Sequence, residues 1–230
     1  MQNIKTIAFD ADDTLWVNEP LFRINEEKFE DLLKEYVSCE KITAKLYDAE
    51  IRNLKHFGYG IKGFVLSMIE TAIELTNGEI KGCDLKKIIE WGKEQIDFPV
   101  NLLDGVEEVV KSLKGKYRLM IITKGDLFDQ ESKIARSGLV DCFDIIEIVS
   151  EKDEAVYSSI MKKHNLKAEE LIMIGNSLKS DILPMVNIGA YAVHIPFHTT
   201  WIHEQVGDVD LESKHYTELG DIREVFELLK

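Results

Sequence analysis

The segment FDADDTLW, residues 9–16, places three carboxylates within four positions, directly after the apolar residues Ile7, Ala8 and Phe9. Acids this close together repel one another, so folding alone does not explain them at the end of a buried strand. Carboxylates in such a position can bind a cation, attack an electrophilic centre or transfer a proton. The segment therefore predicts a chemical site.

Further polar groups follow apolar runs later in the chain. They are Thr123 and Lys124 after YRLMII, Lys152 shortly after DIIEIV, and Asn176 and Asp181 after LIMI. Carboxylate, amide and carbonyl oxygens without His or Cys suit Mg²⁺ and not zinc. A metal, a lysine and a hydroxyl can together neutralise a phosphoryl group, which a carboxylate can attack to form an acyl phosphate. A second carboxylate can then protonate the leaving oxygen and activate water.

The elements that position these residues are predicted to form an α/β fold. A buried strand is expected at Ile4–Asp10, and from residue 101 onwards strands alternate with helices. This alternation favours a parallel sheet, in which ligands bind beyond the carboxyl ends of the strands. The continuous apolar runs favour strands that are covered on both faces. The later strands are expected at residues 117–123, 144–149, 171–174 and 191–195.

Residues 20–97 have helical patterns and no convincing strand. Four helices in succession predict an inserted helical domain over residues 17–99, with residues 1–16 and 100–230 forming the α/β core. They are expected to run from Pro20 through Tyr36 and over residues 43–57, 61–76 and 84–96. In the core, Asp104 and Glu107 predict an acidic capping box at the start of a helix. The other core helices are expected near residues 128–137, 154–164, 181–187 and 221–229.

DADDT, Thr123, Lys152 and GNSLKSD resemble, in order and spacing, the four motifs of the haloacid dehalogenase-like (HAD) hydrolase superfamily. The resemblance covers essentially the whole chain and implies a Rossmann-like core with a C1-type helical cap. It implies that Asp10 is the nucleophile and a Mg²⁺ ligand, and that Asp12 is the general acid and base with its backbone carbonyl on the metal. Phosphoryl oxygens would be bound by Thr123, the Lys124 backbone amide and Lys152, and the remaining metal ligands would be Asn176 and Asp181.

The sequence departs from the family pattern at two positions. Asn176 stands where the family usually has a metal-binding Asp, which removes a charge but keeps an oxygen ligand. Lys152 is followed by Asp153, whereas the family's lysine is commonly followed by Pro. Lys124 is therefore retained as an alternative cation for the site.

Composition restricts the partners. The 230-residue chain carries a net charge of −14, which repels phosphate backbones and makes nucleic acid and anionic membranes poor partners. Its apolar fraction is 45%, and no apolar run reaches the length of a membrane span. The three cysteines fit neither a disulfide framework nor a zinc site, and the first residues do not resemble a signal peptide, so the expected location is the cytoplasm. The sequence does not indicate an oligomeric state.

The leading hypothesis is a Mg²⁺-dependent phosphatase that hydrolyses a small phosphorylated metabolite through an aspartyl-phosphate intermediate. Within the superfamily, a dehalogenase is disfavoured because Asp12 is present, whereas a phosphosugar mutase uses the same motifs and stays an alternative. A phosphorylated signalling module is disfavoured by the chain length and by the helical insertion. A catalytically inactive binding protein is a further alternative, for which Asn176 is the only indication.

Overall fold

The computed structural model describes residues 3–199, 201–204 and 216–230, and it divides the chain into two compact units. The α/β unit contains residues 1–19, 100–124 and 130–230, and the helical unit contains residues 20–99 and 125–129. None of the helices in the described ranges is long and apolar enough to cross a bilayer. The action of the inserted helices as a cap stays a prediction.

The α/β unit is built on a parallel sheet, which confirms the predicted fold class. Its six described strands lie in the order β3-β2-β1-β4-β5-β6. Strand β1 lies in the middle of the sheet. Strands β2 and β3 lie on one side of it and β4, β5 and β6 on the other, so the strand order reverses between β1 and β4. The strands are β1 (Thr6–Phe9), β2 (Arg118–Lys124), β3 (Ile145–Val149), β4 (Leu171–Gly175), β5 (Tyr191–His194) and β6 (Thr217–Glu218).

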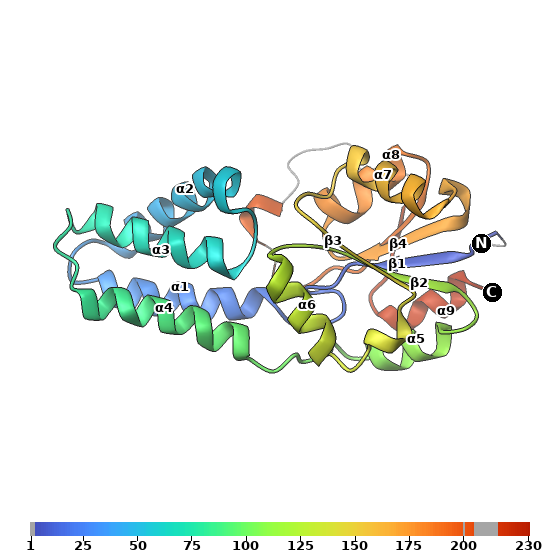
Figure 1. Cartoon of the computed structure of the whole chain (residues 1–230), viewed down its shortest axis with the longest axis horizontal. Coiled ribbons are helices and arrows are strands. Elements are labelled where there is room, and N and C mark those ends of the chain that lie inside the picture. Colours follow the sequence, from blue (N-terminus) through green and yellow to red (C-terminus); the bar gives the residue numbers. More distant parts are fainter. Residues whose placement is uncertain (1–2, 200, 205–215) are drawn as a thin grey trace. The chain divides into compact units, whose positions relative to one another are not determined.

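Helices cover both faces of the sheet because side chains alternate between the faces along each strand (Figure 1). On one face, Ile7 and Phe9 of β1 belong to a core cluster with the apolar side of α5. On the other face, Ala8 belongs to a cluster with residues of α7 and α8. The helices of the unit are α5 (Val106–Leu113), α6 (Leu127–Arg136, whose first residues belong to the helical unit), α7 (Glu154–His164), α8 (Leu183–Asn187) and α9 (Val225–Leu228).

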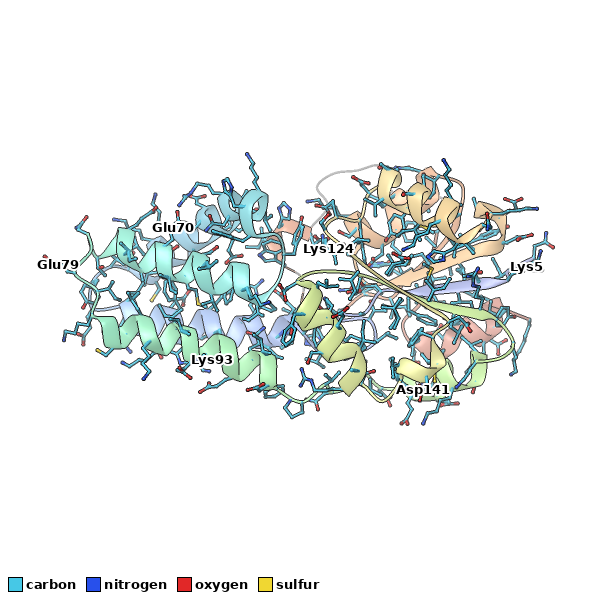
Figure 2. The ribbon with its side chains drawn as sticks, viewed as in Figure 1. Lys5, Glu70, Glu79, Lys93, Lys124 and Asp141 are labelled. Atoms are coloured by element: carbon cyan, nitrogen blue, oxygen red, sulfur yellow. The ribbon has the colours of Figure 1, made fainter. Side chains whose placement is uncertain are left out.

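The sheet register brings the predicted functional segments to one edge. Phe9, the last residue of β1, is paired with Ile121 of β2 and Ile174 of β4. The next residue, Asp10, donates its backbone N–H to the carbonyl of Ile174 at 2.9 Å. Figure 2 shows Lys124 at the opposite end of the sheet from Lys5, which precedes β1. The carboxyl ends of β1, β2 and β4 therefore meet.

The helical unit has a separate apolar core formed by α1 (Glu19–Leu33), α2 (Cys39–Phe57), α3 (Ile61–Leu75) and α4 (Gly82–Asp97). Phe29, Met68 and Ile88 are fully buried in it. Gly92 marks a close approach of α4 to α3, because a Cβ at this position would overlap Val65 Cγ2. The four predicted helices are thus confirmed, with small shifts at their ends.

Some local predictions were wrong. Strand β3 is an edge strand, and Ile146 is 39% exposed, so its apolar run does not reflect cover on both faces. Helix α5 has no side-chain cap; Gly105 precedes it with φ +78°, and Asp104 accepts a hydrogen bond from Arg223. The helix predicted from Asp181 instead begins as a π-helical turn, Leu178–Ile182, before α8. The short strand β6 was not predicted.

Gly92→Ala is expected to destabilise the protein by up to about 2 kcal/mol. Overpacking against Val65 costs about 1–3 kcal/mol, which exceeds the gain of up to about 1 kcal/mol in helix propensity. Urea denaturation measures the difference. Gly82→Ala is the matched control in the same helix, because no atom lies within 4 Å of its added Cβ. Equal effects of the two substitutions would contradict the close-packing explanation.

Candidate active site

The centre of the site is a buried lysine between two carboxylates. Lys152 Nζ contacts Asp10 Oδ1 and lies 2.7 Å from Asp181 Oδ1. All three side chains are less than 10% exposed. Burial alone would lower the pKa of Lys152, but the charges of Asp10 and Asp181 raise it well above its usual value. Lys152 therefore stays an ammonium group that neutralises the predicted nucleophile.

Strand β4 permits this arrangement because it ends in glycine. A Cβ at Gly175 would overlap the carboxylate of Asp181. The second oxygen of that carboxylate, Oδ2, accepts the backbone N–H of Ser177 at 3.0 Å. Asp181 is thus oriented by one backbone donor and one ammonium group, immediately beside the end of β4.

Oxygen atoms of Asp10 and Asn176 converge on the hydroxyl of Thr14. Thr14 Oγ1 lies 2.9 Å from Asp10 Oδ2 and 3.2 Å from Asn176 Oδ1, and it accepts the Asn176 backbone N–H at 3.1 Å. A carboxylate and an amide oxygen within reach of one atom fit a hard cation such as Mg²⁺. The described residues contain no cluster of three or more His, Cys, Asp and Glu side chains suited to a metal.

The metal ligands stay predictions. The structure places Asp10 and Asn176 in one arrangement and Asp181 in another. Asp10 and Asn176 are brought together through Thr14. Both carboxylate oxygens of Asp181 instead contact N–H groups, those of Lys152 and Ser177. In this arrangement Asp181 orients the lysine.

Thr123 at the end of β2 carries a buried hydroxyl, and its Oγ1 has no hydrogen-bond partner among the described residues. A buried hydroxyl is normally paired, because leaving it unpaired costs about 1–3 kcal/mol. An oxygen of a bound ligand would supply the missing partner. This fits the predicted role of Thr123 in binding a phosphoryl oxygen.

The side chain of Lys124 points to a different cluster. Its Nζ lies 2.6 Å from Glu204 Oε1 and 3.0 Å from Ser180 Oγ. Glu204 Oε2 also accepts hydrogen bonds from Ser177 and Ser180. Lys152 and not Lys124 is therefore the cation in contact with Asp10. Glu204 lies in a 3₁₀ turn, Ile202–Glu204, far along the chain from its partners, and no local sequence pattern indicated it.

Asp12 is surrounded by nitrogen donors that the sequence analysis also missed. Its carboxylate accepts hydrogen bonds from Trp16 Nε1 at 2.7 Å, from Gln130 Nε2 at 2.9 Å and from Lys133 Nζ at 2.8 Å. Gln130 and Lys133 are three residues apart on α6, which follows β2 directly. Residues three apart lie on the same side of a helix, so polar residues with this spacing just after β2 were the sequence signal for a contact with the site.

Asp13 has a structural role. Its φ is +60°, and its carboxylate accepts the backbone N–H groups of Asn18 and Glu19 at the start of α1. Exposed N–H groups at a helix N-terminus are commonly satisfied by such an acceptor. Asp13 thus joins the strand-end loop to the first turn of the helix.

Glu204→Gln should lower the free energy of unfolding at neutral pH by up to about 3 kcal/mol. Burial alone would raise the pKa of Glu204, but Lys124 and the hydroxyls of Ser180 and Ser177 lower it from 4.5 to about 2. A depressed pKa stabilises the fold above the unfolded-state pKa. The difference between wild type and variant should therefore shrink as the pH falls from about 4.5 towards 2.

Denaturation at several pH values measures this difference. Glu151→Gln is the matched control, because Glu151 contacts the same lysine at 3.4 Å but is 46% exposed. It should change the free energy of unfolding by less than about 1 kcal/mol. A pH-independent effect of Glu204→Gln would contradict the role of its charge.

Comparison with known proteins places this chain in a family. The model of the haloacid dehalogenase-like hydrolases matches residues 4–189. The chain is 26% identical to the glyceraldehyde 3-phosphate phosphatase of Pyrococcus furiosus, across 99% of this chain and 95% of that protein. It is 25% identical to the N-acylneuraminate-9-phosphatase of Mus musculus, across 94% of this chain and 90% of that protein.

A solved structure agrees with the sequence matches. A haloacid dehalogenase-like family hydrolase from Xanthomonas campestris is 40% identical and superimposes with a TM-score of 0.87, covering 99% of this chain and 92% of its own. At this coverage the match includes both the segments of the parallel sheet and the inserted helices. The chain belongs to the haloacid dehalogenase-like hydrolase family.

Proposed function

We propose that the protein is a Mg²⁺-dependent phosphatase that hydrolyses a small phosphorylated metabolite through an aspartyl phosphate on Asp10. The observation that carries the proposal is the contact of the buried Asp10 carboxylate with Lys152. On the adjacent strand, the Thr123 hydroxyl has no partner within the described part of the chain. The names of the curated relatives, which are phosphatases of phosphorylated small molecules, support the same reaction.

In the first step, the Asp10 carboxylate attacks phosphorus and the bond from phosphorus to the ester oxygen breaks. Asp12 donates a proton to the departing oxygen. Lys152 and the Thr123 hydroxyl stabilise the charge on the transferring group. In the second step, Asp12 takes a proton from water, which attacks phosphorus, releases inorganic phosphate and restores the Asp10 carboxylate.

Asp10, Asn176 and the backbone carbonyl of Asp12 would hold Mg²⁺, with Asp181 as a further predicted ligand. When bound, the cation supplies positive charge to the phosphoryl oxygens. The family resemblance assigns substrate choice to the inserted helices, residues 17–99. Assay of a panel of phosphorylated compounds, compared by kcat/KM, would identify the physiological metabolite.

Asp10→Asn should lower kcat by at least about 10³-fold and abolish any trapped acyl phosphate, because an amide cannot act as the nucleophile. Release of inorganic phosphate with Mg²⁺, and its loss with EDTA, measures the reaction. Asp13→Asn is the control, because this neighbouring carboxylate caps α1, and its activity should stay within about threefold of wild type.

The product distinguishes the remaining alternatives. Free phosphate supports the phosphatase, whereas an isomerised sugar phosphate without free phosphate would identify a mutase. Full activity of Asp10→Asn would refute the assigned nucleophile. Folded wild type that turns over no compound of a broad panel with Mg²⁺ would favour a catalytically inactive binding protein.

A further inference from the structure

The carboxylate of Asp12 accepts hydrogen bonds from Trp16, which is close in sequence, and from two residues of α6, which are distant in sequence. Oδ1 accepts from Trp16 Nε1 and Lys133 Nζ, and Oδ2 accepts from Gln130 Nε2 and the same Lys133 Nζ. Three side chains from two elements of the chain therefore contact both oxygens of the carboxylate. Lys133 contacts both oxygens at 2.8 Å, so its ammonium group faces the carboxylate symmetrically.

Gln130 connects this carboxylate to the loop that ends β2. Its Nε2 donates to Asp12 Oδ2 at 2.9 Å and to the backbone carbonyl of Lys124 at 3.0 Å. Both partners are acceptors, so the orientation of the amide is determined. Its Oε1 is left buried without a partner among the described residues. The two donated bonds therefore hold the amide between Asp12 and the end of β2.

We propose that Lys133 and Gln130 are positioning residues that hold Asp12 in a fixed orientation relative to the phosphoryl-binding end of β2. The proposal rests on the function proposed above for Asp12 as general acid and base. Neither residue needs to contact the substrate. Lys133 sets the direction of the carboxylate, with Asn18 Oδ1 as a further acceptor at 3.2 Å, and Gln130 sets its position relative to Lys124.

The kinetic test uses two phosphate esters that differ in their need for an acid. Lys133→Met should lower kcat/KM about 10²-fold for an alkyl phosphate, whose leaving oxygen needs a proton. For p-nitrophenyl phosphate, whose leaving group needs none, kcat/KM should change less than about threefold. Lys133→Arg should restore most of the loss, and Gln130→Met should produce the same pattern more weakly. Lys111→Met, which alters an exposed lysine paired with Glu107, is the control.

The structural test does not depend on turnover. The Trp16 indole N–H donates to Asp12, so its resonance in a ¹H–¹⁵N spectrum reports the position of that carboxylate. The chain has three tryptophans, and Trp16→Phe assigns the signal. The resonance should move in Lys133→Met, return towards its wild-type position in Lys133→Arg and stay unchanged in Lys111→Met.

The outcomes separate this proposal from the proposed function. An unmoved Trp16 resonance in folded Lys133→Met overturns the positioning role whether or not the protein is active. Equal losses of kcat/KM on both esters also overturn it. If wild type turns over neither these esters nor any compound of a broad phosphate panel with Mg²⁺, but the resonance moves as expected, the proposed function fails while the orientation of Asp12 by Lys133 stands.

Discussion

The structure depends on one constraint: neighbouring carboxylates at the end of β1 repel one another, and each needs its own positively charged or N–H partner. Two like charges about 4 Å apart repel by about 4 kcal/mol at an effective dielectric constant near 20. The fold gives each acid its own partners: Lys152 for Asp10, Lys133 for Asp12, and the first backbone N–H groups of α1 for Asp13. Removal of any one partner would leave a carboxylate uncompensated beside another.

This compensation requires the sheet order that the chain adopts. Lys152 comes from the loop after the edge strand β3, whereas Asp181 comes from the turn after β4 on the other side of β1. They meet at Asp10 because β1 is central and the carboxyl ends of its neighbours coincide. Gly175 leaves the space that Asp181 occupies, so a backbone feature of β4 determines where the lysine is held.

The sequence was sufficient to predict those parts of the site that follow an apolar strand. Asp10, Thr123 and Asn176 each come directly after such a run, and a parallel sheet brings strand ends together. Lys133 and Gln130 were missed because helical periodicity shows which residues share a face of the helix, but not which residues that face contacts. Glu204 was missed because it reaches Lys124 through a turn that follows β5, a contact that only the folded chain defines.

The balance of charge in the site explains why a divalent cation suits it. The carboxylates of Asp10, Asp12 and Asp181 face the ammonium groups of Lys152 and Lys133, and Lys124 is paired with Glu204. These three acids outnumber the two ammonium groups that face them, and the excess negative charge would oppose the approach of a phosphate dianion. A divalent cation bound there would offset that charge and attract the phosphate. Asn176 is consistent with this balance, because an aspartate there would add a further negative charge beside Asp10, whereas the amide offers an oxygen without that charge.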